Sequence, residues 1–350
     1  MASRPPSGGP YPPQVWQLGG APSKSVDIPV TAVFLALFIG GAATHMTIFQ
    51  RNKRRGHKFV LSLLLFGFCM ARILTSVLRI SSTALPRNLN LAIASSIFNA
   101  AGTLLLFIVN LLFAQRILRS LHPGFGWARP VSWAFKALYI LIAATIIMVI
   151  TVVVQSFFTL DPEIRSISRS IQLYGSTFFA VASFLPIPIT LAALAAHHFR
   201  QPGKLGTPIE PLGAGPLRTK AALVLAASVL LCIGATYKCA VAWFDPVPRA
   251  QPMPDRFSKA AFYVMNFGVE VVVVYLYALG RVDRRFWVPN GASKRRTYVV
   301  VEEEKDEEKG NGEDSAAEQR DSVIMSRPGT ARSEGSRTRD VDDVKAEWEV

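Results

Sequence analysis

The sequence predicts an all-α, polytopic membrane protein with seven transmembrane helices. Seven long apolar stretches occur in the 350 residues, and Lys and Arg are concentrated in every second connection between them. A helix rises ~1.5 Å per residue, so ~20 apolar residues cross ~30 Å of hydrocarbon. The stretches that meet this length are 28–49, 59–80, 89–113, 131–158, 171–196, 221–244 and 260–279.

The length and number of these stretches exclude two other fold classes. Buried helices of soluble proteins can be equally apolar, but seven consecutive runs of this length are very unusual in a soluble domain. A membrane β-barrel would show segments of about ten residues with alternating polarity. The seven runs therefore predict transmembrane helices.

The distribution of basic residues predicts the orientation. The connections after spans one, three, five and seven hold 18 Lys and Arg, whereas the opposite side holds 8. Because basic residues beside a span are retained in the cytosol, the N-terminus should lie outside and the C-terminus should be cytosolic. We expect an integral, multi-pass protein of the plasma membrane rather than of an internal membrane.

The two ends of the chain differ from the apolar region. Residues 1–27 are rich in Pro and Gly and should be extended or disordered, while residues 28–280 form the predicted seven-helix domain. Residues 281–350 begin as a basic juxtamembrane segment and continue as an acidic tail, since positions 301–350 hold 16 Asp and Glu against 8 Lys and Arg. We expect this tail to be disordered and cytosolic. It either offers sites to a kinase or cytosolic partner or only solubilises the protein.

The net charge of +14 indicates which partners to expect. The basic residues lie in clusters beside the spans and not on a separate module with stacking aromatic residues, so we expect no nucleic-acid partner. The expected partners are the lipid bilayer and the anionic headgroups of its cytosolic leaflet.

Polar side chains inside the spans indicate a candidate site, because a polar group in hydrocarbon costs several kcal/mol unless it finds a partner. In span seven, Tyr263, Asn266 and Glu270 recur at helical spacing and so share one face. Asn99 of span three should face the same interior. Several helices are therefore expected to present polar stripes to the centre of the bundle.

Glu270 is the single acid within the predicted spans, and its candidate partners are Arg72 and Lys238. Counted from the outer ends of the spans, Arg72 lies ~12 Å deep, Glu270 ~15 Å and Lys238 ~9 Å. Arg72 matches Glu270 better and can bond a carboxylate through two donors. We expect Arg72 to be the main partner and Lys238 the second one. A structural ion pair and a ligand- or proton-binding pair are both compatible with the sequence.

Pro186 and Pro188 in span five form a candidate hinge. Two prolines remove two backbone donors and should kink or locally unwind the helix. A static kink that improves packing is the alternative.

Catalytic and cofactor chemistry is not expected. Span seven lacks a lysine for a retinal Schiff base, Asp is absent from the predicted spans, and His45 has no second histidine near it for a metal. We therefore expect no enzyme activity, no metal and no cofactor.

Residues 18–293 resemble a known family. The motifs that carry the resemblance are 45–50 (HMTIFQ), 54–59 (RRGHKF), 66–72 (FGFCMAR), 115–119 (QRILR), 122–127 (HPGFGW), 184–188 (FLPIP) and 281–286 (RVDRRF). The chain is similar to uncharacterised seven-span membrane proteins of filamentous fungi, which share a domain of unknown function. The resemblance implies a fungal source and no particular activity. In topology alone, the chain is similar to fungal seven-span receptor-like and lipid-stress-response proteins.

Three functions fit these observations. The first is a receptor-like sensor, in which a small molecule or lipid binds an outward-facing cavity lined by the polar residues and the proline segment moves the cytosolic loops. The second is a transporter or lipid-handling protein, against which the lack of a visible internal repeat counts mildly. The third is a membrane scaffold that recruits partners through its tail.

Overall fold

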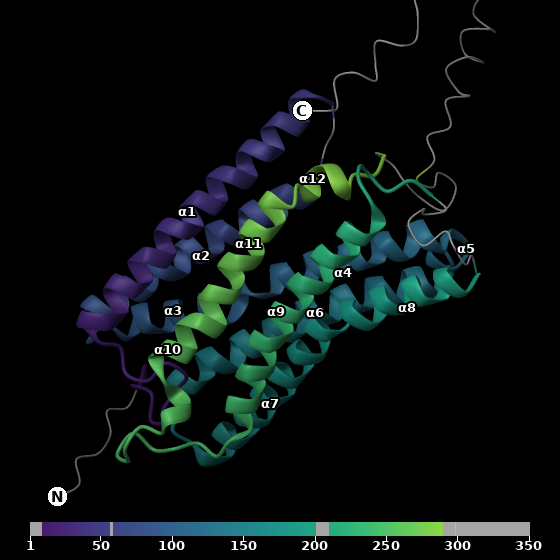
Figure 1. Ribbon diagram of the computed structural model, residues 1–350. Helices are drawn as coiled ribbons and strands as arrows, with labels where there is room; N and C mark the ends of the chain where they lie inside the picture. Colours follow the sequence, from purple (N-terminus) through teal and green to yellow (C-terminus); the bar gives the residue numbers. More distant parts are fainter. Residues whose placement is uncertain (1–8, 57–58, 201–209, 290–297, 299–350) are drawn as a thin grey trace, which may run out of the picture. The chain divides into compact units, whose positions relative to one another are not determined.

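The computed structural model describes residues 9–56, 59–200, 210–289 and 298. Within these residues the chain is helical, apart from loops and an isolated β-bridge between Val15 and Pro248. The helices are α1 (Lys24–Arg54), α2 (Val60–Ala84), α3 (Leu89–Gly102), α4 (Leu104–Leu121), α5 (Pro123–Gly126), α6 (Arg129–Phe158), α7 (Pro162–Phe184), α8 (Pro186–Arg200), α9 (Leu217–Trp243), η1 (Asp255–Phe257), α10 (Lys259–Phe262), the π-helix η2 (Tyr263–Gly268), α11 (Val269–Leu279) and α12 (Val282–Arg285) (Figure 1). The predicted acidic tail lies outside the described residues.

Seven helical stretches in this described part are long and apolar enough to cross a membrane. They are Lys24–Arg54, Val60–Ala84, Leu89–Leu121, Arg129–Phe158, Pro162–Arg200, Leu217–Trp243 and Lys259–Leu279. The predicted all-α fold is thereby confirmed for the described residues, and so is the number of helical stretches long and apolar enough to cross a membrane. The orientation of the termini stays a prediction.

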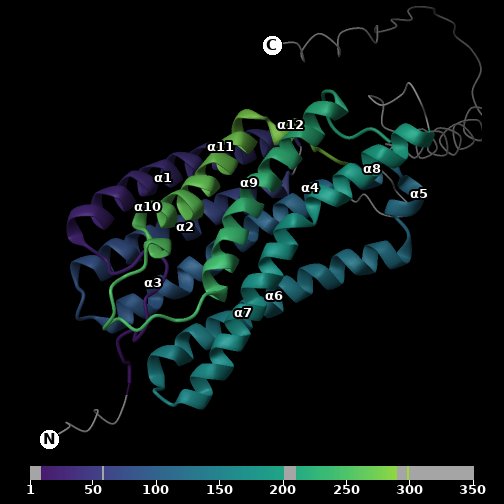
Figure 2. The ribbon, with the colours of Figure 1, turned by 60° about the horizontal axis from the view of Figure 1, so that its bottom comes forward.

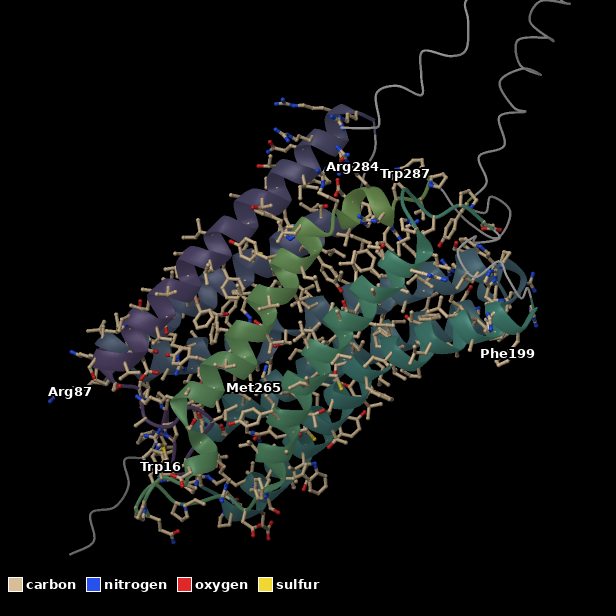
Figure 3. The ribbon with its side chains drawn as sticks, viewed as in Figure 1. Trp16, Arg87, Phe199, Met265, Arg284 and Trp287 are labelled. Atoms are coloured by element: carbon tan, nitrogen blue, oxygen red, sulfur yellow. The ribbon has the colours of Figure 1, made fainter. Side chains whose placement is uncertain are left out.

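Membrane-length stretches that follow one another in the sequence pack as neighbours, and α11 lies between α1 and α9 (Figures 1 and 2). Helix α4 also contacts α2, α8 and α9, which places it in the interior of the bundle. We call the end at which α1 begins the predicted outer end and the opposite one the predicted cytosolic end. Figure 3 shows Trp16 and Arg87 at the first and Arg284 and Phe199 at the second.

The segment before α1 lies across the predicted outer end. The Tyr11 amide donates to the Phe157 carbonyl (2.6 Å), and the Trp16 amide donates to the Val247 carbonyl (2.9 Å). Helix α1 then begins at Lys24, four residues before the predicted start of span one. Because of this earlier start, Asp27 belongs to a helix of the bundle. Helix α7 likewise begins earlier than predicted and contains Glu163, so the statement that Glu270 is the single acid in the spans is wrong for both α1 and α7.

Three of the long helical stretches are interrupted near their middle. The third is interrupted at Thr103, between α3 and α4, and the last contains the π-helical segment η2. The fifth is interrupted at Leu185, directly before Pro186, but Leu185 keeps right-handed helical angles (φ −51°, ψ −38°). The backbone therefore stays helical through Leu185, and the predicted local unwinding at the prolines is not seen. Their action as a hinge stays a prediction.

Small residues allow close helix contacts, as is common in membrane bundles. A Cβ atom added at Gly234 of α9 would lie 2.7 Å from the backbone oxygen of Met265 in η2. In contrast, nothing lies within 4 Å of a Cβ atom added at Gly67 of α2. The contact between α9 and η2 thus depends on the missing side chain at position 234.

We expect Gly234→Ala to lower the free energy of unfolding by about 1–3 kcal/mol, because backbone must move to admit the methyl group. Gly67→Ala is the matched control and should be neutral or slightly stabilising. Thermal unfolding of both purified variants in detergent measures the difference. Equal stability of the two variants would contradict the close contact.

Candidate functional site

An ion pair between α2 and α11 lies at the centre of the bundle. An Nη2 hydrogen of Arg72 is donated to Oε1 of Glu270, and the two side chains are 0% and 1% exposed. Thr103, at the interruption of span three, donates its hydroxyl to the same oxygen of Glu270 (2.7 Å) and accepts from Nη2 of Arg72 (2.9 Å). Three spans are therefore joined at this oxygen. Lys238 of α9 bonds to Thr103 and adds a fourth span. We call this polar group the central cluster: Arg72, Thr103, Lys238 and Glu270.

Lys238 of α9 joins this cluster through Thr103. Its Nζ donates to the Thr103 hydroxyl oxygen (3.1 Å), whereas Arg72 forms the direct ion pair with Glu270. This arrangement agrees with the depths estimated from the sequence, which favoured Arg72. Thr103 thus connects both cations with the acid.

The arginine fits into the bundle because its neighbours leave room and cover it. A Cβ atom added at Gly102 would lie 2.5 Å from Cζ of Arg72, so a side chain at position 102 would collide with the guanidinium group. Cζ of Arg72 also lies 5.3 Å from the centre of the Phe267 ring and 5.9 Å from that of Phe68. Such contacts between a cation and aromatic rings offset part of the cost of removing the charge from water.

Asn266 and Asn99 form a second contact beside the central cluster. Nδ2 of Asn266 donates to Oδ1 of Asn99 (2.7 Å), which joins η2 to α3. Towards the predicted cytosolic end, the Tyr277 hydroxyl donates to Oδ1 of Asn110, and Nδ2 of Asn110 donates to Ser228 (3.2 Å). Polar contacts therefore recur at successive depths along the inner faces of the last and third spans.

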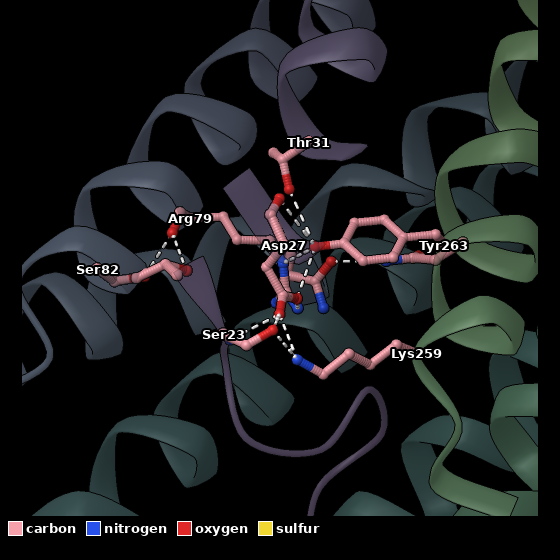
Figure 4. A network of polar contacts seen from close by, with 10 residues as sticks. Ser23, Asp27, Thr31, Arg79, Ser82, Lys259 and Tyr263 are labelled. Carbon is pink, nitrogen blue, oxygen red and sulfur yellow. Dashed lines mark hydrogen bonds and ion pairs between the residues drawn. The ribbon is translucent and has the colours of Figure 1, made fainter. Parts of the chain in front are cut away.

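Tyr263 belongs to a separate network at the predicted outer end (Figure 4). Its hydroxyl donates to Oδ1 of Asp27 (2.8 Å) and accepts from Nε of Arg79 (3.0 Å). Asp27 also forms ion pairs with Arg79 (3.0 Å) and with Lys259 (2.6 Å). The predicted site residues are thus divided among this outer network, the central cluster and the contact between Asn99 and Asn266.

The sequence interpretation missed Asp27 and Lys259. A hydropathy window ends where charge begins, so Asp27 itself set the predicted boundary of span one and was left outside it. The sequence held one usable signal, because an acid such as Asp27 is favoured in the first turn of a helix. In the structure Asp27 accepts from the backbone amide of Ser23 (2.7 Å).

Several atoms in and beside the central cluster have no hydrogen-bond partner among the described residues. They are Nε and Nη1 of Arg72, Oε2 of Glu270 and, beside the cluster, Oδ1 of Asn266. Buried polar atoms are paired in the great majority of cases, so unused donors and acceptors at one place require an explanation. They could bind water or a small polar ligand.

The acid and its main partner are buried, but the cluster as a whole is not. Arg72, Glu270 and Asn266 are at most 1% exposed, whereas Thr103 and Lys238 are partly exposed. The predicted outward-facing cavity would need these helices to separate. Among the described residues, no three His, Cys, Asp or Glu side chains form a candidate metal site.

We expect Arg72→Met to lower the free energy of unfolding by about 3–5 kcal/mol, because it leaves the Glu270 charge buried and unpaired. Glu270→Met should have a similar effect, and the double variant should recover most of the loss. A double-mutant cycle from unfolding in detergent micelles measures this coupling. Additive losses would contradict a direct pair.

Comparison with known protein families gives a match for the last part of the helical region. Residues 217–287, from α9 through α12, match a family described as "Protein of unknown function (DUF3112)". No curated protein matches the chain. Together with the apolar helices, the match indicates a multi-pass membrane protein of which one part is similar to a family of unknown function. The fungal origin and the seven-span nature of that family stay expectations.

Proposed function

We propose that this protein is a receptor-like membrane sensor, in which a small molecule or lipid binds at the central cluster and changes the packing of the helices around it. The observation that carries the proposal is the set of unpaired atoms on Arg72, Glu270 and Asn266. An unpaired buried donor or acceptor costs about 1–3 kcal/mol. A polar ligand that satisfied several of them would therefore stabilise the helix arrangement that admits it.

The interruptions in the helices support a change of packing. Thr103, where the third span is interrupted, is a member of the central cluster. The π-helix η2 ends two residues before Glu270. π-Helical turns are rare and frequently occur at functional sites. A helix with weakened backbone hydrogen bonds needs less free energy to bend, so these positions are suited to move when the cluster is rearranged.

Span five, which is divided at Leu185, gives a route to the predicted cytosolic end. Helix α8 begins at Pro186 and packs against α4 and α9. Thr103 lies directly before α4, and Lys238 is part of α9. A shift of the central cluster can therefore be transmitted to α8 through these two helices. The basic connections and the acidic tail, both predicted to be cytosolic, would then offer a partner a surface that changes.

A transporter is the second candidate. The polar contacts of Asn99 with Asn266, of Arg72 with Glu270 and of Asn110 with Tyr277 follow one another along the bundle. Such a series is typical of proton relays in membrane proteins. The scaffold hypothesis depends on the tail, which lies outside the described residues.

The variant Glu270→Gln tests the sensor, because it removes the charge while keeping the size of the side chain. We expect folded protein with faster amide exchange in residues 263–268 and in the predicted cytosolic part of α8, since the ion pair no longer holds these segments. Hydrogen–deuterium exchange of the full-length protein in lipid nanodiscs measures this. Glu163→Gln, at the start of α7, is the matched control and should behave like the unchanged protein.

Three other results would contradict the proposal. Unfolded Glu270→Gln protein would indicate a purely structural pair, and exchange equal to that of the control would exclude coupling to α8. Loss of proton flux into proteoliposomes, without any change in exchange, would favour the transporter. A strain with Glu270→Gln, screened beside a deletion strain on lipids, sterol inhibitors and nutrients, would then identify the class of ligand.

A further inference from the structure

A basic recess lies between the end of α1 and the junction of α11 with α12, at the predicted cytosolic end. Its volume is about 450 Å³. The residues that line it are Ala43, Thr44, Thr47, Ile48, Arg51, Asn52, Arg55, Ala278, Arg281, Asp283 and Arg284. We propose that this recess binds an anionic phospholipid whose headgroup carries a phosphate monoester. This site is separate from the central cluster and does not depend on the proposed sensor function.

The charge of the recess selects a strongly anionic ligand. Four arginines and one aspartate line it, a net charge of +3. Within the described residues, Arg51, Arg55 and Arg284 form no ion pair, so their charges are free for a ligand. Arginine binds phosphate through parallel N–H donors. A phosphate monoester carries nearly two negative charges and therefore fits this cluster better than a zwitterionic headgroup does.

The aspartate in the recess holds the frame together and does not neutralise the free arginines. Asp283 is 4% exposed and accepts from Nδ2 of Asn52 (3.0 Å) and from Nε of Arg281 (3.3 Å). The bond from Asn52 ties the end of α1 to the start of α12, whereas Arg281 precedes α12 in the same segment. The basic side chains are thus brought from two helices to one place before any ligand arrives.

The backbone at Arg281 is a second sign of a built site. Arg281 has φ +46° and ψ +51°, a left-handed conformation that Gly or Asn adopts more readily at the end of a helix. Strained residues of this kind cluster at functional sites and persist where the surrounding structure holds them. The chain places an arginine where glycine would fit the backbone better, directly at the recess.

The part of the recess nearer the middle of α1, around Ala43 and Thr44, suits an acyl chain. Ala43 lies eight residues before Arg51 on α1, which is about 12 Å along the helix axis. The hydroxyls of Thr44 and Thr47 already donate to the Gly40 and Ala43 carbonyls (2.8 and 2.7 Å), so they offer no free donor to a ligand. With Ile48, this wall is small and apolar. A ligand with a charged head and a hydrocarbon chain matches both halves, as basic pockets between membrane helices bind lipid headgroups.

Titration calorimetry of the full-length protein in neutral detergent micelles tests the proposal with three probes. They are dioctanoyl phosphatidic acid, dioctanoyl phosphatidylcholine and glycerol 3-phosphate. We expect saturable binding of phosphatidic acid, and at least about tenfold weaker binding of the other two, which lack the charge or the chains. Equal binding of phosphatidylcholine would overturn the headgroup assignment. Equal binding of glycerol 3-phosphate would overturn the lipid assignment.

Variants then separate this site from a general attraction of charge. Arg51→Gln and Arg284→Gln should each weaken binding of phosphatidic acid about tenfold. Lys53→Gln and Arg54→Gln remove cations from the same turn of α1 that do not line the recess, and they should leave binding unchanged. Losses of equal size in all four variants would overturn the proposal, because they would indicate unspecific attraction.

Two further variants test the apolar wall of the recess and the left-handed Arg281. Ala43→Trp should fill the space beside this exposed wall residue and weaken binding of phosphatidic acid without changing the thermal stability. Arg281→Asn should keep or raise the thermal stability, since Asn tolerates the left-handed backbone, and should nevertheless weaken binding about tenfold. Unchanged binding in both variants would overturn the recess as the binding site.

Discussion

The buried ion pair between Arg72 and Glu270 is the interaction on which the interior of this bundle depends. Two charges removed from water cost several kcal/mol each, and this cost is offset only while both partners stay in contact. Because the partners lie on α2 and α11, and Thr103 of the third span bonds to both, the pair fixes the positions of three spans at once. The absence of a side chain at Gly102 is part of the same arrangement, since the guanidinium group occupies that space.

Two further polar networks flank this pair, and they differ from it in how completely their donors and acceptors are paired. Asp27 closes the predicted outer end through Arg79 and Lys259, and Tyr277 bonds to Asn110 on the opposite side of the central cluster. Both flanking networks use their donors and acceptors more completely than the central cluster does. The unpaired atoms thus lie in the central cluster, where the third span is interrupted and η2 precedes Glu270. The sensor proposal rests on the occurrence of both features at one place.

Much of this arrangement could be predicted from the sequence, and the contacts that were not predicted share a physical cause. Helical spacing placed Tyr263, Asn266 and Glu270 on one face, and estimated depth favoured Arg72 over Lys238. Spacing could not show that Tyr263 turns to Asp27, because the partner came from a helix start that hydropathy had excluded. Nor could it reveal η2 or the role of Thr103, since these depend on contacts between distant segments. The nearly complete burial of Arg72 and Glu270 likewise depends on packing between distant helices, which no local pattern in the sequence shows.

The ionisation state of Glu270 tests the central claim most directly. The infrared difference spectrum between the unchanged protein and Glu270→Gln, recorded at neutral pH in lipid nanodiscs, isolates the vibrations of this one side chain. If Arg72 and Glu270 form the buried ion pair, the difference must contain the two stretching bands of a carboxylate. A single carbonyl band of a protonated carboxylic acid in their place would show that Glu270 is neutral, and would contradict the account.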